Sequence, residues 1–119
     1  MPNPVTHFEV TGKDGAALQS FFGELFGWEI NADNPMNYGM VAPQEGQGIG
    51  GGVGPNPMGS PSVTFYVEVA DLQASLDKAV ELGGSVVMPV TDIPGIVTFA
   101  LFASPEGHVI GLAGPRPAQ

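Results

Sequence analysis

The sequence predicts an α+β fold made of two repeated modules, each with the order strand, helix and three strands. The first observation is an internal repeat at one constant offset, which aligns Phe8 with Phe65 and Asp14 with Asp71. The second is the recurrence, in the same order in both halves, of an alternating apolar segment, a capped helix pattern and short strand-like segments. Several matches at one offset indicate a duplicated unit.

Each half opens with an alternating segment that predicts a strand. These segments are Val5–Val10 in the first half and Thr64–Val69 in the second. Alternation of apolar and polar residues is the period of a strand with one buried face. The side chains of His7 and Glu9 are therefore expected to point together to one face of the sheet, and that of Phe8 to the other.

A helix is predicted after each of these strands. Asp14 and Asp71 stand at the expected N-caps, where a carboxylate accepts from unpaired N–H groups of the first turn. Apolar residues then recur at helical spacing and form one stripe in each helix. The first stripe consists of Leu18, Phe21, Phe22, Leu25 and Phe26, and the thinner second one of Leu72, Leu76, Ala79 and Val80. Glycine ends both patterns, at Gly27 and at Gly83-Gly84.

Three short strands are expected after each helix. They are placed near residues 28–31, 38–42 and 48–53 in the first half, and near 85–89, 96–103 and 108–113 in the second. Residues 46–60 are dense in Gly, Pro and Asn and should contain the linker, while Pro89 and Pro94 predict turns or sheet edges. We therefore expect a single domain over residues 1–119, with module one at about 4–54, a linker at about 54–61 and module two at about 62–113.

The charge balance narrows the classes of partner. The chain has 3 Lys+Arg against 12 Asp+Glu, a formal net charge of -9. Nucleic-acid binding needs basic patches that replace counterions around phosphates, and three basic residues do not make one. An anionic membrane surface is disfavoured for the same reason. A neutral or cationic small molecule is compatible with this charge.

The absence of cysteine and the hydropathy of the chain exclude further kinds of site and location. The chain has no cysteine, which excludes disulfides, thiolate metal sites and a cysteine nucleophile. The opening Met1–Pro4 lacks the pattern of a secretion signal, and no apolar run approaches the roughly 20 residues that span a bilayer. The expected location is the cytoplasm.

Several segments together resemble one known superfamily. The opening strand Val5–Val10, the helix end Leu25–Trp28 and the closing segment Ser104–Leu112 are similar, in order and spacing, to the vicinal oxygen chelate superfamily of glyoxalases, bleomycin-resistance proteins and extradiol dioxygenases. The resemblance implies paired βαβββ modules whose eight strands form an incomplete barrel around a cavity, and a homodimer.

The resemblance also implies where a divalent metal would be held in metal-dependent members. The four ligand positions fall on His7, on the stretch Gly50–Gly52, on Thr64 and on Gly111. Only His7 keeps a ligating side chain, and one imidazole does not hold a divalent ion. No metal and no other cofactor is therefore predicted. The glycines are also expected to enlarge the cavity and make room for a larger ligand.

The candidate site combines polar and apolar side chains. His7 and Glu9 are the candidate catalytic residues, although a purely structural histidine is as good an interpretation of His7. Met36, Tyr38 and Met88 are further candidates for an apolar lining. The predicted ligand-binding set is His7, Glu9, Thr64, Tyr66, Glu68, Trp28, Met40 and Phe102.

Three functions follow from these residues. The leading hypothesis is a metal-independent small-molecule-binding protein of the sequestration or resistance type. The second is a metal-free lyase, isomerase or epimerase with His7 as general base, assisted by Glu9 or Tyr66. The third is a metal-dependent glyoxalase or dioxygenase, and a purely structural interaction module stays open.

Overall fold

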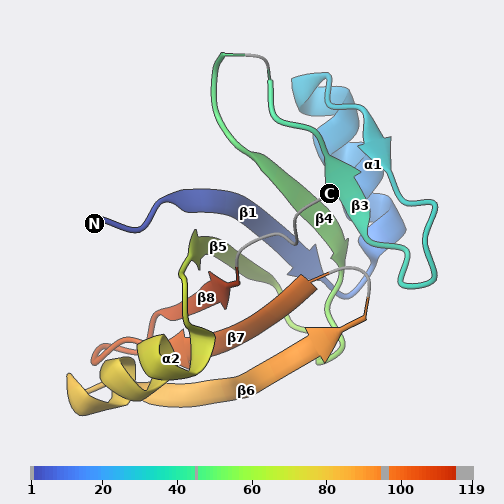
Figure 1. The fold of residues 1–119 in the computed structure, drawn as a ribbon. Coiled ribbons are helices and arrows are strands. Elements are labelled where there is room, and N and C mark those ends of the chain that lie inside the picture. The colour runs from blue at the N-terminus through green and yellow to red at the C-terminus, as the bar shows by residue number, and fades with distance from the viewer. Residues whose placement is uncertain (1, 45, 95–96, 115–119) are drawn as a thin grey trace. The chain divides into compact units, whose positions relative to one another are not determined.

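The computed structural model describes residues 2–44, 46–94 and 97–114 (Figure 1). The chain divides into two compact units, one of residues His7–Thr64 and one of Met1–Thr6 together with Phe65–Gln119. We name them the His7 unit and the Phe65 unit. Neither described helix is long and apolar enough to cross a membrane.

The elements follow the βαβββ order twice. In the first module they are β1 (Val5–Gly12), α1 (Gly15–Phe26), β2 (Ile30–Asn31), β3 (Gly39–Val41) and β4 (Gly50–Pro55). In the second they are β5 (Ser62–Glu68), α2 (Leu72–Glu81), β6 (Ser85–Ile93), β7 (Val97–Ala103) and β8 (Val109–Ala113). The predicted α+β class and the repeated element order are confirmed.

In the His7 unit the strands are ordered β2-β3-β4-β1. β1 runs parallel to β4, and the other neighbours are antiparallel. The register places Glu9 and Met40 beside Gly52, so these positions share one face of the sheet. The other face is covered by α1, where the Phe8 and Trp28 rings lie with centroids 5.3 Å apart.

In the Phe65 unit the order is β5-β8-β7-β6, again with one parallel pair, β5 and β8. Its core lies between the sheet and α2 and is formed by the buried side chains of Val69, Leu76, Ala100 and Leu112. Leu76 is 2% exposed, and Leu72 is partly buried against the same cluster. These two leucines of the apolar stripe thus pack α2 onto the sheet.

The prolines of module two lie at a sheet edge and a turn, as predicted, since β6 is an edge strand of its unit and Pro94 lies in a turn. The strand is longer than expected, because β6 runs through Pro89 to Ile93 instead of ending near residue 89. β6 is the last strand in the order of its unit, and its pairing with β7 shifts register between Val86 and Met88 and again between Met88 and Thr91. Proline lacks an N–H group and is accepted at such irregular edge positions, so the strand continues past it.

Both helices begin at the predicted aspartates. Asp14 Oδ1 accepts from Ala17 N at 3.0 Å, and Asp71 Oδ1 accepts from Ala74 N at the same distance. α1 ends at Gly27, whose φ of 71° lies in the left-handed region. The C-cap of α2 is Leu82, the residue just before the pair Gly83-Gly84.

The N-cap of α1 yields a stability prediction. Replacing Asp14 by alanine should lower the free energy of unfolding by about 1 kcal/mol, because an N–H of the first turn loses its acceptor. The measurement is urea denaturation followed by circular dichroism. Asp14→Asn is the matched control, since asparagine caps as well as aspartate, and it should stay close to the wild type. Equal losses in both variants would show that the charge, and not the cap, is what matters.

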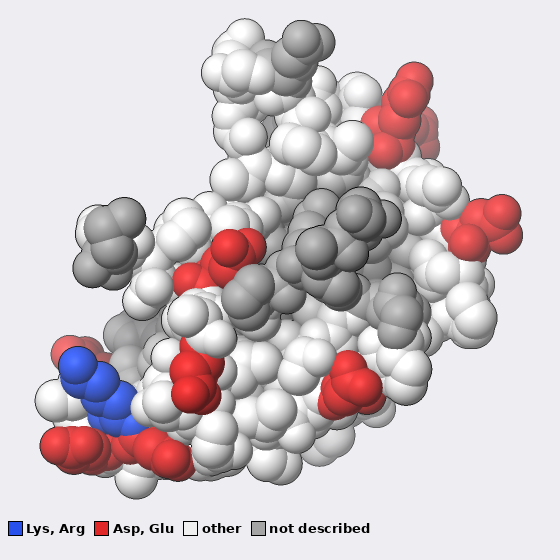
Figure 2. All heavy atoms as spheres, in the orientation of Figure 1, with Lys and Arg blue, Asp and Glu red and all other residues white. Residues whose placement is uncertain are grey.

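Acidic side chains are scattered over the face drawn in Figure 2, with several of them close together at its lower left. The basic group visible there lies beside acidic ones over α2, the helix that carries Lys78 together with Asp77 and Glu81. On this face the described basic side chains therefore form no continuous patch.

Candidate functional site

Three polar side chains of the His7 unit form a connected network. His7 Nε2 lies 2.8 Å from Tyr38 Oη, and Tyr38 Oη donates to Glu9 Oε2 at 2.9 Å. His7 and Glu9 are two residues apart on β1, so they share the face of the sheet opposite α1. The predicted common orientation of His7 and Glu9 is therefore confirmed, and a tyrosine hydroxyl joins them.

The network fixes the protonation of one histidine nitrogen. A phenol carries a single hydroxyl hydrogen, and that of Tyr38 is donated to Glu9. The bond between Tyr38 Oη and His7 Nε2 must then be donated by the imidazole, so Nε2 carries a proton.

The backbone of Tyr38 is held in place from both sides. The amide side chain of Asn34 donates from Nδ2 to the Tyr38 carbonyl at 2.8 Å and accepts from Tyr38 N at 3.0 Å. Gln19 of α1 donates to the carbonyls of Asn37 and Val53 at 2.9 and 2.8 Å. These bonds fasten the segment before β3 to α1 and β4, and so fix where the phenol ring lies.

The Tyr38 ring occupies the space that a side chain at position 52 would need. A Cβ atom built on Gly52 would overlap Cζ and Oη of Tyr38. In the Phe65 unit a Cβ atom built on Gly111 would overlap the ring of Tyr66, its partner in the β5–β8 register. The expectation that these glycines leave room for a larger ligand is therefore wrong, because aromatic rings fill both positions.

The residues present do not fit the metal site of the superfamily. Gly52 and Gly111 offer no donor atom, and each lies against a tyrosine ring. His7 is the only one of the four positions with an imidazole, and its Nε2 is engaged with Tyr38 Oη. Within residues 2–44, 46–94 and 97–114, no three His, Asp or Glu side chains are grouped to hold an ion. We therefore derive no chemistry through a metal.

The remaining predicted residues divide between the two faces of the sheets. Met40 is paired with Gly52 and shares the face of Glu9. Thr64 is buried, at 9% exposed, near the start of β5. In the Phe65 unit, Tyr66 and Glu68 alternate with Val67 and lie on the face opposite α2.

Two predicted residues lie on the helix-covered faces instead. Trp28 packs against Phe22 and Phe26 of α1, with ring centroids 6.2 and 5.0 Å apart. Phe102 packs against the core beneath α2. Both are large, partly buried apolar side chains on the helix-covered face of their own sheet, and not on the face that carries its polar side chains.

Sequence reasoning placed Tyr38 among apolar lining residues and missed its polar role. Tyr38 stands in a loop just before β3, and no periodic pattern indicates where its hydroxyl points. The available signal was indirect. Glycine recurs at consecutive positions of β4, and a large ring near a strand with glycines is a frequent packing solution.

Comparison with protein families and curated proteins gives a consistent result. The family model described as a glyoxalase-like domain matches residues 7–113. The "Putative glyoxylase CFP32" of Mycobacterium bovis and that of Mycobacterium tuberculosis are each 32% identical over 108 residues. The match covers 83% of this chain and 41% of those proteins, so the chain spans about two fifths of their length.

Solved structures show the same fold. A glyoxalase/bleomycin resistance protein/dioxygenase superfamily member from Vibrio splendidus superposes with a TM-score of 0.64 at 20% identity, covering 96% of this chain and 100% of that one. Methylmalonyl-CoA epimerase from Mycobacterium tuberculosis gives a TM-score of 0.61 at 17% identity, covering 95% and 88%. At these identities the likeness shows the fold alone.

Proposed function

Because the chain belongs to the glyoxalase-like domain family, we propose that it binds a small molecule on the helix-free face of the His7 unit, without a divalent metal. The observation that carries the proposal is the Tyr38 hydroxyl, held between His7 and Glu9 beside Gly52. A hydrogen-bonding network stands where metal-dependent members of the superfamily place a ligand to the ion. Sequestration of the bound molecule is the simplest function of such a site.

The chemistry of this face favours a neutral or cationic ligand that presents hydrogen-bond donors. Glu9 brings a carboxylate to this face, and an ionised carboxylate only accepts hydrogen bonds. Met40 is 47% exposed beside the network and adds a flexible apolar surface. With the Glu9 carboxylate on this face and a net charge of -9 on the chain, an anionic ligand is disfavoured at this site.

A ligand screen with variants tests this proposal. The protein is screened against small amines, amides and polyols for a rise in melting temperature, and the affinity of each hit is measured by calorimetry. Tyr38→Phe removes the bridging hydroxyl and should weaken binding about fivefold to tenfold, the effect of one hydrogen bond. The same variants are checked for bound metal by elemental analysis.

The second histidine provides the matched control. His108 belongs to the Phe65 unit, is exposed and bonds through Nδ1 to Ser104 Oγ at 2.8 Å. His7→Gln should weaken the same ligand as strongly as Tyr38→Phe, while His108→Gln should not. Stoichiometric metal in the purified protein, or equal effects of the two histidine variants, would contradict the proposal.

A second candidate is metal-free proton transfer with His7 as general base. The histidine, hydroxyl and carboxylate are linked in series, an arrangement that orients a base and stabilises its protonated form. In this mechanism the His7 imidazole takes a proton from the carbon next to a carbonyl group.

Exchange of a compound's carbon-bound proton for deuterium, in deuterium oxide, distinguishes proton transfer from simple binding. Hydroxy and keto carbonyl compounds are incubated with the protein, and loss of the carbon-bound proton is followed by nuclear magnetic resonance. Exchange that His7→Gln abolishes and His108→Gln preserves supports catalysis. Equal exchange with and without protein would leave the binding function alone.

A further inference from the structure

A concave surface lies on the helix-covered side of the His7 unit, opposite the face that carries His7 and Glu9. It has a volume of about 680 Å³ and is formed by the end of β1, the apolar face of α1 and the segment from Gly59 to Val63. This volume is in the range of small-molecule sites, which commonly measure about 300–1,000 Å³. We call it the α1 groove. All its lining residues belong to the His7 unit.

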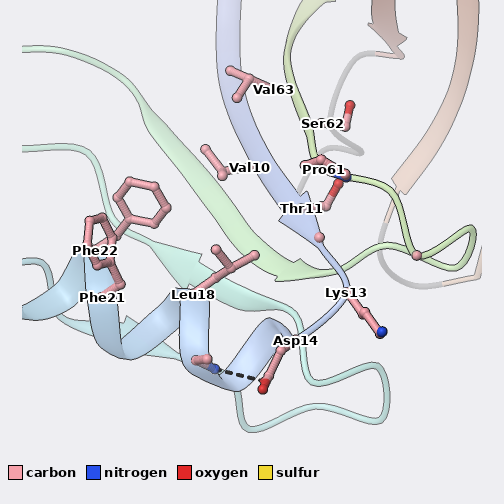
Figure 3. Close-up of a pocket in the computed structure, with 13 residues that line it drawn as sticks. Val10, Thr11, Lys13, Asp14, Leu18, Phe21, Phe22, Pro61, Ser62 and Val63 are labelled. Carbon is pink, nitrogen blue, oxygen red and sulfur yellow. Dashed lines mark hydrogen bonds between the residues drawn. The ribbon is translucent and has the colours of Figure 1, made fainter.

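The α1 groove is polarised along its length. Figure 3 shows Phe21 and Phe22 at one end, with Val10 and Leu18 between them and the other end, where Thr11, Ser62 and Lys13 lie. Its apolar walls stay accessible, since Phe21 is 59% exposed and Val63 78%. An apolar surface with a polar end fits an amphipathic molecule whose apolar body lies along α1.

The charged side chain at the polar end of the α1 groove indicates which head group its ligand would carry. Lys13 is the only Lys or Arg between residues 7 and 64, although that segment contains several carboxylates. The other charged group of the groove, Asp14, already accepts from Ala17 N as the N-cap. The flexible stem of Lys13 allows its ammonium group to reach an anion at this end.

From these observations we propose that the α1 groove binds an aliphatic carboxylate of medium chain length, with the chain against Phe21, Phe22 and Leu18 and the carboxylate at Lys13. A second copy of this chain is a poorer occupant, because each copy carries a net charge of -9. The site is separate from His7, Tyr38 and Glu9, which face the other side of the sheet.

The single tryptophan provides the readout. Trp28 stacks on Phe22, with ring centroids 6.2 Å apart, and Phe22 lines the α1 groove. The full chain is titrated with decanoate below its micelle concentration while Trp28 emission is followed, and decanol is titrated as the uncharged probe. We expect saturable binding of both, with decanoate the tighter ligand.

Three variants separate the contribution of the Lys13 charge from that of the apolar walls of the α1 groove. Lys13→Gln should weaken decanoate about twofold to fivefold, the effect of one exposed ion pair, and leave decanol unchanged. Ala17→Leu places a larger side chain in the groove and should abolish binding of both probes. Ala16→Leu changes the neighbouring exposed residue outside the groove and should bind as the wild type does.

Several results would overturn the proposal. They are the absence of saturable binding, equal loss of both probes in Lys13→Gln, and unchanged binding in Ala17→Leu. A dimer in sedimentation that Ala17→Leu dissociates would show that a second copy occupies the groove. Tyr38→Phe should leave decanoate binding intact, so failure at this site and failure of the proposed function are distinguishable.

Discussion

Replacing Gly52 by alanine should destabilise the protein by about 1–3 kcal/mol, the usual effect of overpacking, and should break the network of His7, Tyr38 and Glu9. The methyl group would overlap the Tyr38 ring, so the ring must move away from β4. Tyr38 is fastened through its backbone by Asn34, which limits that movement. The measurements are urea denaturation and the affinity of the ligand found in the screen.

A double-mutant cycle shows whether the ring is the cause. In a Tyr38→Ala background the space beside Gly52 is empty, so the added methyl group should change the free energy of unfolding by less than about 0.5 kcal/mol. Gly23→Ala is the control within α1, where the nearest atom is the Trp28 carbonyl oxygen at 3.3 Å and alanine favours the helix. Additive effects of Gly52→Ala and Tyr38→Ala would refute the assigned contact.

Leu76→Ala is expected to lower the free energy of unfolding by about 2–5 kcal/mol. Leu76 is 2% exposed and belongs to the only cluster of buried residues that joins α2 to the described sheet of its unit. Truncation removes buried apolar surface and leaves a cavity that Ala100 and Leu112 cannot fill. Chemical denaturation measures the loss.

The same helix provides the control for this variant. Val80 is 47% exposed, so Val80→Ala should change stability by no more than about 0.5 kcal/mol. If the two variants were equally destabilised, burial of Leu76 would not be the cause, because alanine favours the helix at both positions.

Most of the fold was predictable because its signals are local. The alternation in β1 and β5 and the caps at Asp14 and Asp71 each depend on a few adjacent residues, and all appear in the structure as expected. The ends of strands were less accurate. Pro89 illustrates the reason. It is accepted within β6 because β6 is the last strand of its unit and pairs there with β7 alone, which depends on distant residues.

The site was predictable only in part, because it depends on contacts between distant residues. The common face of His7 and Glu9 followed from alternation along one strand. The bond from Tyr38 to both of them joins residues about thirty positions apart and depends on the Asn34 and Gln19 amides. Likewise, glycine at positions 52 and 111 suggested empty space, whereas the rings that fill it come from other strands or loops.

The packing of Tyr38 against Gly52 also constrains how the family's chemistry can change in descendants of this chain. A single substitution that placed an acidic side chain at Gly52 would meet the Tyr38 ring and should destabilise the fold. The ring would have to move or be lost first, which would also break its bonds to His7 and Glu9. An acidic side chain at position 52 is therefore difficult to introduce by one substitution, because a second change at Tyr38 must accompany it.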